Sequence, residues 1–149
     1  MGSTSQALYY VLECAAAYLH VSNSYMALMK LSEAEALRSS VKKERNAIDR
    51  FEEAIFFSLK GEVCSNVGCV KLAKEMSRQA LRLLEKRRKK QAWLVQRSRC
   101  LSLLEDLYSQ EGTSGGQRFS RLAALMKANT DSKMHSYQAA DSHIGQALN

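Results

Sequence analysis

The sequence contains no proline, although an average chain of its 149 residues would hold about seven. Proline interrupts helix interiors because it lacks an amide hydrogen and its ring clashes with the preceding turn. Its absence therefore favours long, uninterrupted helices. Glycine is also missing between Cys69 and Gln110, so the sequence leaves open whether residues 69–109 form one helix or two.

The patterns of membrane segments and of catalytic or metal sites are missing as well. No apolar run approaches the length of about 20 residues that a bilayer requires, and no segment resembles a signal peptide. The three histidines and four cysteines show no metal-ligand spacing, and no Ser/His/Asp or Cys/His arrangement is apparent. We therefore expect no catalytic residue, no metal and no cofactor. The cysteines, each within an apolar helical pattern, are expected to be buried, reduced thiols of a cytoplasmic protein. They are Cys14, Cys64, Cys69 and Cys100.

Positive charge is concentrated in one short stretch. Residues 82–99 hold eight basic side chains and only Glu85 as an acid, and this excess equals the formal net charge of +7 of the whole chain. Such a stretch is typical of a solvated helix face, but it can also bind an acidic protein or a nucleic-acid or membrane anion. The candidates for contact with an acidic partner are Arg82, Lys86, Arg87, Arg88, Lys89 and Lys90. Trp93 is the only aromatic residue close by, which weakens the case for nucleic acid.

Apolar residues recur at three- and four-residue intervals, which predicts helices. The predicted helices cover residues 5–22, 24–39, 44–66, 69–84, 91–109 and 118–128. The third helix is expected to stop at Asn66–Gly68, where Gly68 can take the left-handed backbone conformation. The clearest loop is the glycine-containing segment 109–117. We expect one helical domain over residues 1–128 and a polar, weakly ordered tail over residues 129–149.

Small residues recur in the manner of tetratricopeptide repeats, in which they lie where the two helices of a pair cross. The second helix pair has Gly61, Gly68, Ala73 and Ala80 at the spacing of that pattern, and Phe57 at its first aromatic position. The first pair has Ala15, Ala27 and Ala34 at the same offsets, with Ser22 in place of the second glycine. We expect these small residues to pack the helix pairs, with Gly61 meeting Ala73.

The two pairs are offset by more than the tetratricopeptide repeat length, which predicts extra turns at the start of the third helix. The predicted fold is therefore all-α, an irregular tetratricopeptide-like array of about five to six antiparallel helices forming part of an α-solenoid. A plain helical bundle with chance alanines is the alternative.

Extended stretches of the chain also resemble the C-terminal helical region of the soluble, bicarbonate-responsive adenylyl cyclases. The similar stretches lie within residues 7–31, 59–74 and 100–109, and the resemblance covers about residues 7–128. Where these cyclases carry a longer connection containing proline, this chain passes directly from Leu84 to Trp93. The resemblance implies a parent protein that makes cyclic AMP in two cyclase domains, followed by an ATPase-like domain and a helical tail.

None of the catalytic parts of such a cyclase is found in this sequence. It has no paired metal-binding aspartates on a sheet and no phosphate-binding loop of the form Gly-x-x-x-x-Gly-Lys-Ser/Thr. We therefore expect a non-catalytic interaction or regulatory module, whose partner is another protein or other domains of a parent chain rather than nucleic acid or membrane. The alternative function is a basic, anion-binding protein that uses residues 82–99.

Overall fold

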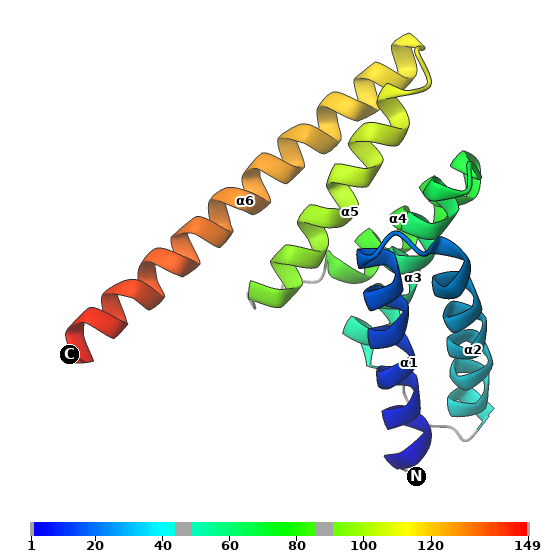
Figure 1. The fold of residues 1–149 in the computed structure, drawn as a ribbon. Coiled ribbons are helices and arrows are strands. Elements are labelled where there is room, and N and C mark those ends of the chain that lie inside the picture. The colour runs from blue at the N-terminus through cyan, green and yellow to red at the C-terminus, as the bar shows by residue number, and fades with distance from the viewer. Residues whose placement is uncertain (1, 44–48, 86–90, 149) are drawn as a thin grey trace. The chain divides into compact units, whose positions relative to one another are not determined.

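The computed structural model contains six helices and no strand among the residues it describes, which are 2–43, 49–85 and 91–148 (Figure 1). Side chains are described over 4–43, 49–85 and 91–135. The helices are α1 (Gly2–His20), α2 (Ser24–Lys43), α3 (Arg50–Asn66), α4 (Val70–Leu84), α5 (Gln91–Ser109) and α6 (Ser114–Leu148). The all-α prediction is confirmed. Residues 69–109 contain two helices, since α4 ends at Leu84 and α5 begins at Gln91.

The chain divides into two compact units, residues 1–83 (unit 1) and residues 84–149 (unit 2). The sequence placed a boundary at residue 128, but this position falls inside α6, which continues unbroken to Leu148. Helix α6 thus includes residues 129–148, where the sequence predicted a polar, weakly ordered tail; the division into a domain and a tail stays a prediction. Its polar composition and weak apolar periodicity gave little helical signal in the sequence.

The core of unit 1 forms where α1, α2 and α3 pack together. Its buried side chains combine leucines with alanines, and the alanines are fully buried at a helix crossing. Because alanine projects only a methyl group, helix axes can approach closely at these positions. The core residues are Leu8, Leu12, Ala15, Ala27, Leu31, Ala34, Phe56, Leu59 and Val63.

The turns that close the α1–α2 and α3–α4 hairpins have the same geometry. In the first turn, Ser22 N donates to Leu19 O at 3.0 Å and Asn23 N donates to Tyr18 O at 2.8 Å. The second turn contains the equivalent pair of bonds, from Gly68 N to Ser65 O at 3.2 Å and from Cys69 N to Cys64 O at 2.8 Å. Both are Schellman motifs, in which one residue must take a positive φ. That residue is Ser22 (φ 61°) in the first and Gly68 (φ 86°) in the second, so the predicted helix stop is confirmed.

Helices α3 and α4 approach closely at Gly61. A Cβ atom at this position would lie 2.6 Å from Ser77 Oγ and 3.4 Å from the backbone oxygen of Ala73. The sequence pointed to Ala73 as the contact; the structure adds Ser77, whose hydroxyl is buried without a hydrogen-bond partner among the described residues. Residue 61 must therefore be small if the present packing is to persist.

The extra residues between the two hairpins do not lengthen the third helix as expected. Helix α3 has 17 residues, fewer than the 19 of α1, and Asp49 caps it by accepting a hydrogen bond from Phe51 N at 3.1 Å. Helix α2 instead continues to Lys43, beyond its predicted end at residue 39. The prediction of extra turns at the start of α3 is wrong for the residues described, and residues 44–48 lie outside them.

A buried arginine holds α2 against α3, a contact that apolar periodicity did not predict. Arg38 Nη2 donates to Glu53 Oε1 at 2.6 Å, and its guanidinium lies 4.3 Å from the Phe56 ring centroid. Only 9% of Arg38 is exposed. Buried guanidinium groups need both a counter-charge and a favourable surface, and aromatic faces attract cations. The polar and the aromatic contact together offset part of the cost of removing this charge from water, while Arg38 Nε is buried without a hydrogen-bond partner among the described residues.

Unit 2 is an antiparallel pair of α5 and α6, shown in yellow-green to red in Figure 1. Helix α5 contributes large buried side chains, which are Trp93, Leu94, Leu101, Leu104, Leu107 and Tyr108. Helix α6 packs against them through small residues, and Gly116, Ala123 and Thr130 are buried. Within unit 2, Trp93 Nε1 donates a hydrogen bond to Leu84 O at 2.6 Å.

Candidate interaction surfaces

The small residues expected to pack the helix pairs are buried with one exception. Ala15, Ala27, Ala34, Ala73 and Ala80 are fully buried, and Gly61 is buried against α4. Gly68 is exposed, and no atom lies within 4 Å of the position its Cβ would take. Gly68 therefore serves the turn between α3 and α4 and makes no packing contact across the pair.

The basic stretch is divided by the limits of the described residues. Arg82 lies on the exposed side of α4, whereas Lys86, Arg87, Arg88, Lys89 and Lys90 fall outside the residues that the structure describes. Their predicted contact with an acidic partner stays a prediction. What the structure adds is the surface of α4 that precedes them.

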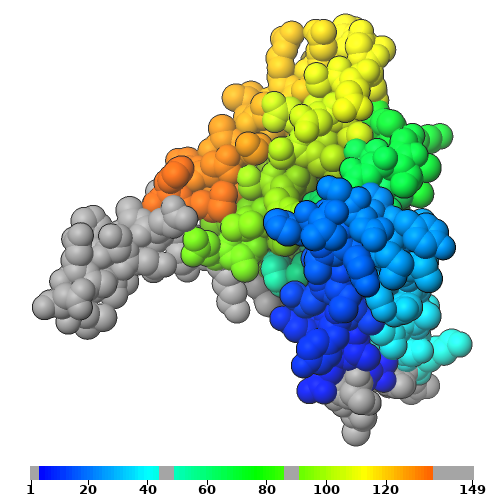
Figure 2. Space-filling model, viewed as in Figure 1, coloured from blue at the N-terminus to red at the C-terminus, as the bar shows by residue number. Residues whose placement is uncertain are grey.

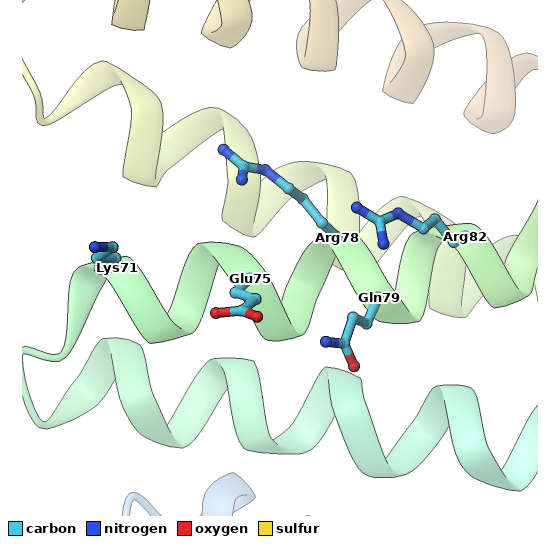
Figure 3. A pocket seen from close by; sticks show the side chains of 5 residues that line it. All are labelled: Lys71, Glu75, Arg78, Gln79 and Arg82. Carbon is cyan, nitrogen blue, oxygen red and sulfur yellow. The ribbon is translucent and has the colours of Figure 1, made fainter.

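The exposed side of α4 carries a polar hollow of about 250 Å³. Lys71, Glu75, Arg78, Gln79 and Arg82 line it (Figure 3). Arg78 and Arg82 are one helical turn apart and extend along the same side of the helix, while Glu75 and Gln79 point away from them. Three cations against one carboxylate give this surface a positive potential, and we call these five residues the α4 face.

The pKa of Lys74, which neighbours the α4 face, is lowered by partial burial and by the positive charge of Arg78. Loss of water around the ammonium is the larger cause of this lowered pKa, and repulsion from Arg78 adds to it. A negative group brought to the α4 face would relieve that repulsion. The excess of cations among the residues of the α4 face therefore favours an acidic ligand at this surface.

The described residues contain no cluster of three or more His, Cys, Asp or Glu side chains that could hold a metal ion. The expectation that all cysteines are buried is wrong for two of them, because Cys14 and Cys69 are exposed while Cys64 and Cys100 are buried. Burial raises the pKa of the Cys64 thiol, which disfavours the reactive thiolate. In the described part of the chain, no helix has the length and apolar character needed to cross a membrane.

Helix α6 has an apolar surface that lies in solvent. Phe119 and Leu122 are each 53% exposed, and Leu125 is 70% exposed. The spacing showed that these residues share one face of the helix, but not that the opposite, smaller face packs against α5. The small residues Gly116 and Ala123 were the signal that could have identified the buried face.

Comparison with known proteins gives relatives of much greater length. The chain is 37% identical over 164 residues to adenylate cyclase type 10 of Oryctolagus cuniculus, a match that covers 87% of this chain and 10% of that protein. This chain is similar to a segment of a soluble adenylyl cyclase. The human adenylate cyclase type 10 matches with the same identity and coverage, and that of Rattus norvegicus is 38% identical over 159 residues, covering 85% of this chain.

The resemblance to the soluble adenylyl cyclases is thereby confirmed, and the chain spans about a tenth of the length of the curated relatives it matches. The alignment with adenylate cyclase type 10 of Oryctolagus cuniculus is longer than the whole of this chain, so the relative has residues without a counterpart here. This agrees with the expected longer connection; its position between Leu84 and Trp93 stays a prediction. No family model matches the chain, and no solved structure matches it.

Proposed function

We propose that this chain is a non-catalytic helical module that works by binding, within or beside a signalling enzyme related to adenylate cyclase type 10. The observation that carries the proposal is the similarity of most of this chain to one tenth of the cyclase. A segment of that size made of helix pairs is suited to holding other domains in place. The tetratricopeptide-like interpretation rests on the equivalent turns at Ser22 and Gly68 and on the buried alanines.

The surface proposed to make the contact is the α4 face together with the basic residues 86–90. Arg78 and Arg82 supply planar donors that suit carboxylates in bidentate geometry. The excess of three cations over one carboxylate on the α4 face favours a partner that is acidic. An acidic segment of another domain, or of a separate protein, is the ligand this chemistry recognises.

The binding part of the proposal is tested with an acidic, glutamate-rich peptide and the full chain. We expect Arg78→Gln with Arg82→Gln to weaken peptide binding several-fold, as measured by fluorescence anisotropy. Glutamine keeps helix propensity while removing the charge. Lys133→Gln is the matched control, since it removes an exposed cation from α6. Equal loss in the control, or no loss in the α4 variant, would contradict the assignment of the α4 face.

The non-catalytic part is tested by supplying the purified chain with ATP and either Mg²⁺ or Mn²⁺. We expect no cyclic AMP above the background of the buffer. Exchange of the matching segment of adenylate cyclase type 10 for this chain tests the regulatory part. Cyclic AMP production is then compared for three forms of the cyclase: one with the exchanged segment, one with the α4 face variant of that segment, and one with the segment deleted. Equal production by all three would refute a regulatory role.

The second candidate is a basic, anion-binding protein, which the eight cations within residues 82–99 favour. Binding to a generic polyanion such as heparin should then persist at physiological salt and disappear when Arg87, Arg88, Lys89 and Lys90 become Gln. We expect instead weak binding that vanishes near that salt, because each neutralised phosphate or sulfate releases counterions. Submicromolar binding that survives salt and is lost in the Gln variant would make this candidate the better account.

A further inference from the structure

Helix α6 exposes an apolar surface that no described residue of unit 2 covers. Phe119, Leu122 and Leu125 project from successive turns and border a shallow hollow of about 500 Å³, which Arg118 and Arg121 also line. Single exposed apolar residues are ordinary, but three together on one helix face mark a site of contact. We call these five residues the α6 face; they belong to the yellow and orange region of Figure 2.

The α6 face is held outward by the packing on the other side of the helix. Gly116, Ala123 and Thr130 are buried, and Ser120 Oγ donates to the backbone oxygen of Glu105 at 3.0 Å. A Cβ at Gly116 would lie 2.6 Å from the backbone oxygen of Tyr108, so α6 fits α5 only in this rotation. Helix α6 therefore cannot turn its leucines inward without losing the contacts of its small face.

Phe119, the aromatic residue of the α6 face, packs against a buried side chain. The rings of Phe119 and Tyr108 lie 5.2 Å apart between centroids with a tilt of 31°. Tyr108 is itself buried at 8% exposure. This ring contact restricts the motion of Phe119 before any partner binds, which lowers the entropic cost of binding.

Charge defines the chemistry of the occupant. Residues 114–130 contain no acidic side chain, and Arg118 and Arg121 form no ion pair with any described residue. Lys127, six residues beyond Arg121, is by contrast paired with Asp131 at 3.6 Å. The α6 face is therefore an apolar stripe with two uncompensated guanidinium groups beside it.

We propose that the α6 face binds an amphipathic helix of a partner protein, whose apolar stripe is flanked by glutamate or aspartate. Leucine-type side chains of such a helix would fill the hollow, and its carboxylates would meet Arg118 and Arg121. A second copy of this chain is disfavoured as the occupant, because pairing two α6 faces brings arginines of like charge together with no acid between them. The proposal uses a different helix and a different compact unit from the α4 face, so either can fail alone.

The test measures binding of a labelled synthetic peptide to the full chain by fluorescence anisotropy. The peptide is an amphipathic helix with a leucine stripe and flanking glutamates, and a second peptide has lysines in place of the glutamates. We expect the glutamate peptide to bind at least about tenfold more tightly than the lysine peptide. Leu122→Gln with Leu125→Gln should weaken the glutamate peptide by at least about tenfold, since each leucine loses its buried contact area.

Two further variants test whether peptide binding depends on the α6 face in particular. Arg118→Gln with Arg121→Gln should reduce the preference for the glutamate peptide and its dependence on salt. Val95→Gln, at an exposed apolar position on α5 of the same unit, should leave binding unchanged. Circular dichroism should show each variant as helical as the parent chain, because every changed side chain is exposed.

Three outcomes would overturn the proposal. The first is equal binding of the two peptides, and the second is glutamate-peptide binding that the leucine variant does not weaken. The third is concentration-dependent self-association of the chain in sedimentation that the leucine variant abolishes. That third result would identify a second copy of this chain as the occupant.

Discussion

Unit 1 and unit 2 both pack antiparallel helices, but they fit them together by different means. In unit 1 the hairpins close through Schellman turns and the helices cross at alanines and Gly61. In unit 2 one helix supplies the large side chains and the other the small ones, and the turn is joined to α6 by the Thr113 hydroxyl, which accepts from Gly116 N at 2.9 Å. A small-residue repeat therefore identifies unit 1 and misses unit 2, although the resulting helix pairs look alike.

The largest expected effect comes from adding a methyl group to the face of α6 that packs against α5 through small residues. Gly116→Ala places a methyl group 2.6 Å from the backbone oxygen of Tyr108, which cannot move without shifting α5. We expect a loss of about 1–3 kcal/mol in the free energy of unfolding of unit 2, the usual cost of overpacking. Fluorescence of Trp93, the only tryptophan, reports on unit 2 during thermal unfolding.

Gly115→Ala is the matched control for Gly116→Ala, because its new methyl group would meet no atom within 4 Å. Its melting temperature should be unchanged or slightly higher. If the two alanine variants melt alike, the close fit of α6 on α5 is wrong. If Gly116→Ala moves the helical signal of the whole chain together with the fluorescence, the two units unfold as one.

The second prediction concerns the equivalent turns of unit 1. Ser22 occupies a left-handed conformation that costs an L-residue about 1 kcal/mol, whereas Gly68 takes it without that cost. Ser22→Gly should therefore stabilise unit 1 by up to about 1 kcal/mol, and Gly68→Ser should destabilise it by a similar amount. Chemical denaturation followed by circular dichroism measures both. Opposite shifts support the equivalence of the turns, and shifts of the same sign refute it.

The third prediction compares Gly61 of unit 1 with Gly116 of unit 2, the two glycines at which an added methyl group would meet a neighbouring helix. Gly61→Ala brings its methyl group against Ser77 Oγ, a side-chain atom that can rotate away. We expect a smaller effect than for Gly116→Ala. With Ser77→Ala the clash disappears, and Gly61→Ala should then stabilise by about 1 kcal/mol through helix propensity. A double-mutant cycle without coupling between residues 61 and 77 would show that the helices do not meet there.

The smallest expected effect concerns the rate at which the cysteines react, and it does not involve the stability of the fold. The exposed thiols of Cys14 and Cys69 should react with a maleimide at ordinary rates, whereas Cys64 and Cys100 should react only after unfolding. The raised pKa of Cys64 slows it further near neutral pH, because less thiolate is present. Mass spectrometry of the native chain should show two modifications, both in unit 1. Modification of Cys100 in the native state would show that unit 2 opens readily.

Sequence patterns predicted most of the helices, but for α6 they did not show which face would be buried. Apolar spacing located α1, α2, α4 and α5, and glycine at position 68 marked a turn with the expected backbone conformation. Periodicity assigns Phe119 and Leu122 to one face, yet burial depends on what the neighbouring helix can accept, and α5 accepts the smaller face of α6.

Candidate sites were harder to predict than helices. The Arg38–Glu53 pair depends on two helices meeting in one register, which no local pattern encodes. The α4 face likewise contains Arg82, which the sequence analysis had named, together with Lys71 and Arg78. A search for consecutive charges overlooks Lys71 and Arg78 because they are not adjacent to the basic stretch. Side chains three and four positions apart share a helix face, whereas adjacent ones do not.

The short turns between consecutive helices have a consequence for how the chain acquires its structure. Each of the pairs α1–α2, α3–α4 and α5–α6 joins neighbours in the chain, so closing the pair costs little loop entropy. Proteins dominated by such local contacts fold in microseconds to milliseconds, far faster than a ribosome adds residues. The hairpin of α1 and α2 can therefore form during translation, before the residues of α5 have been synthesised.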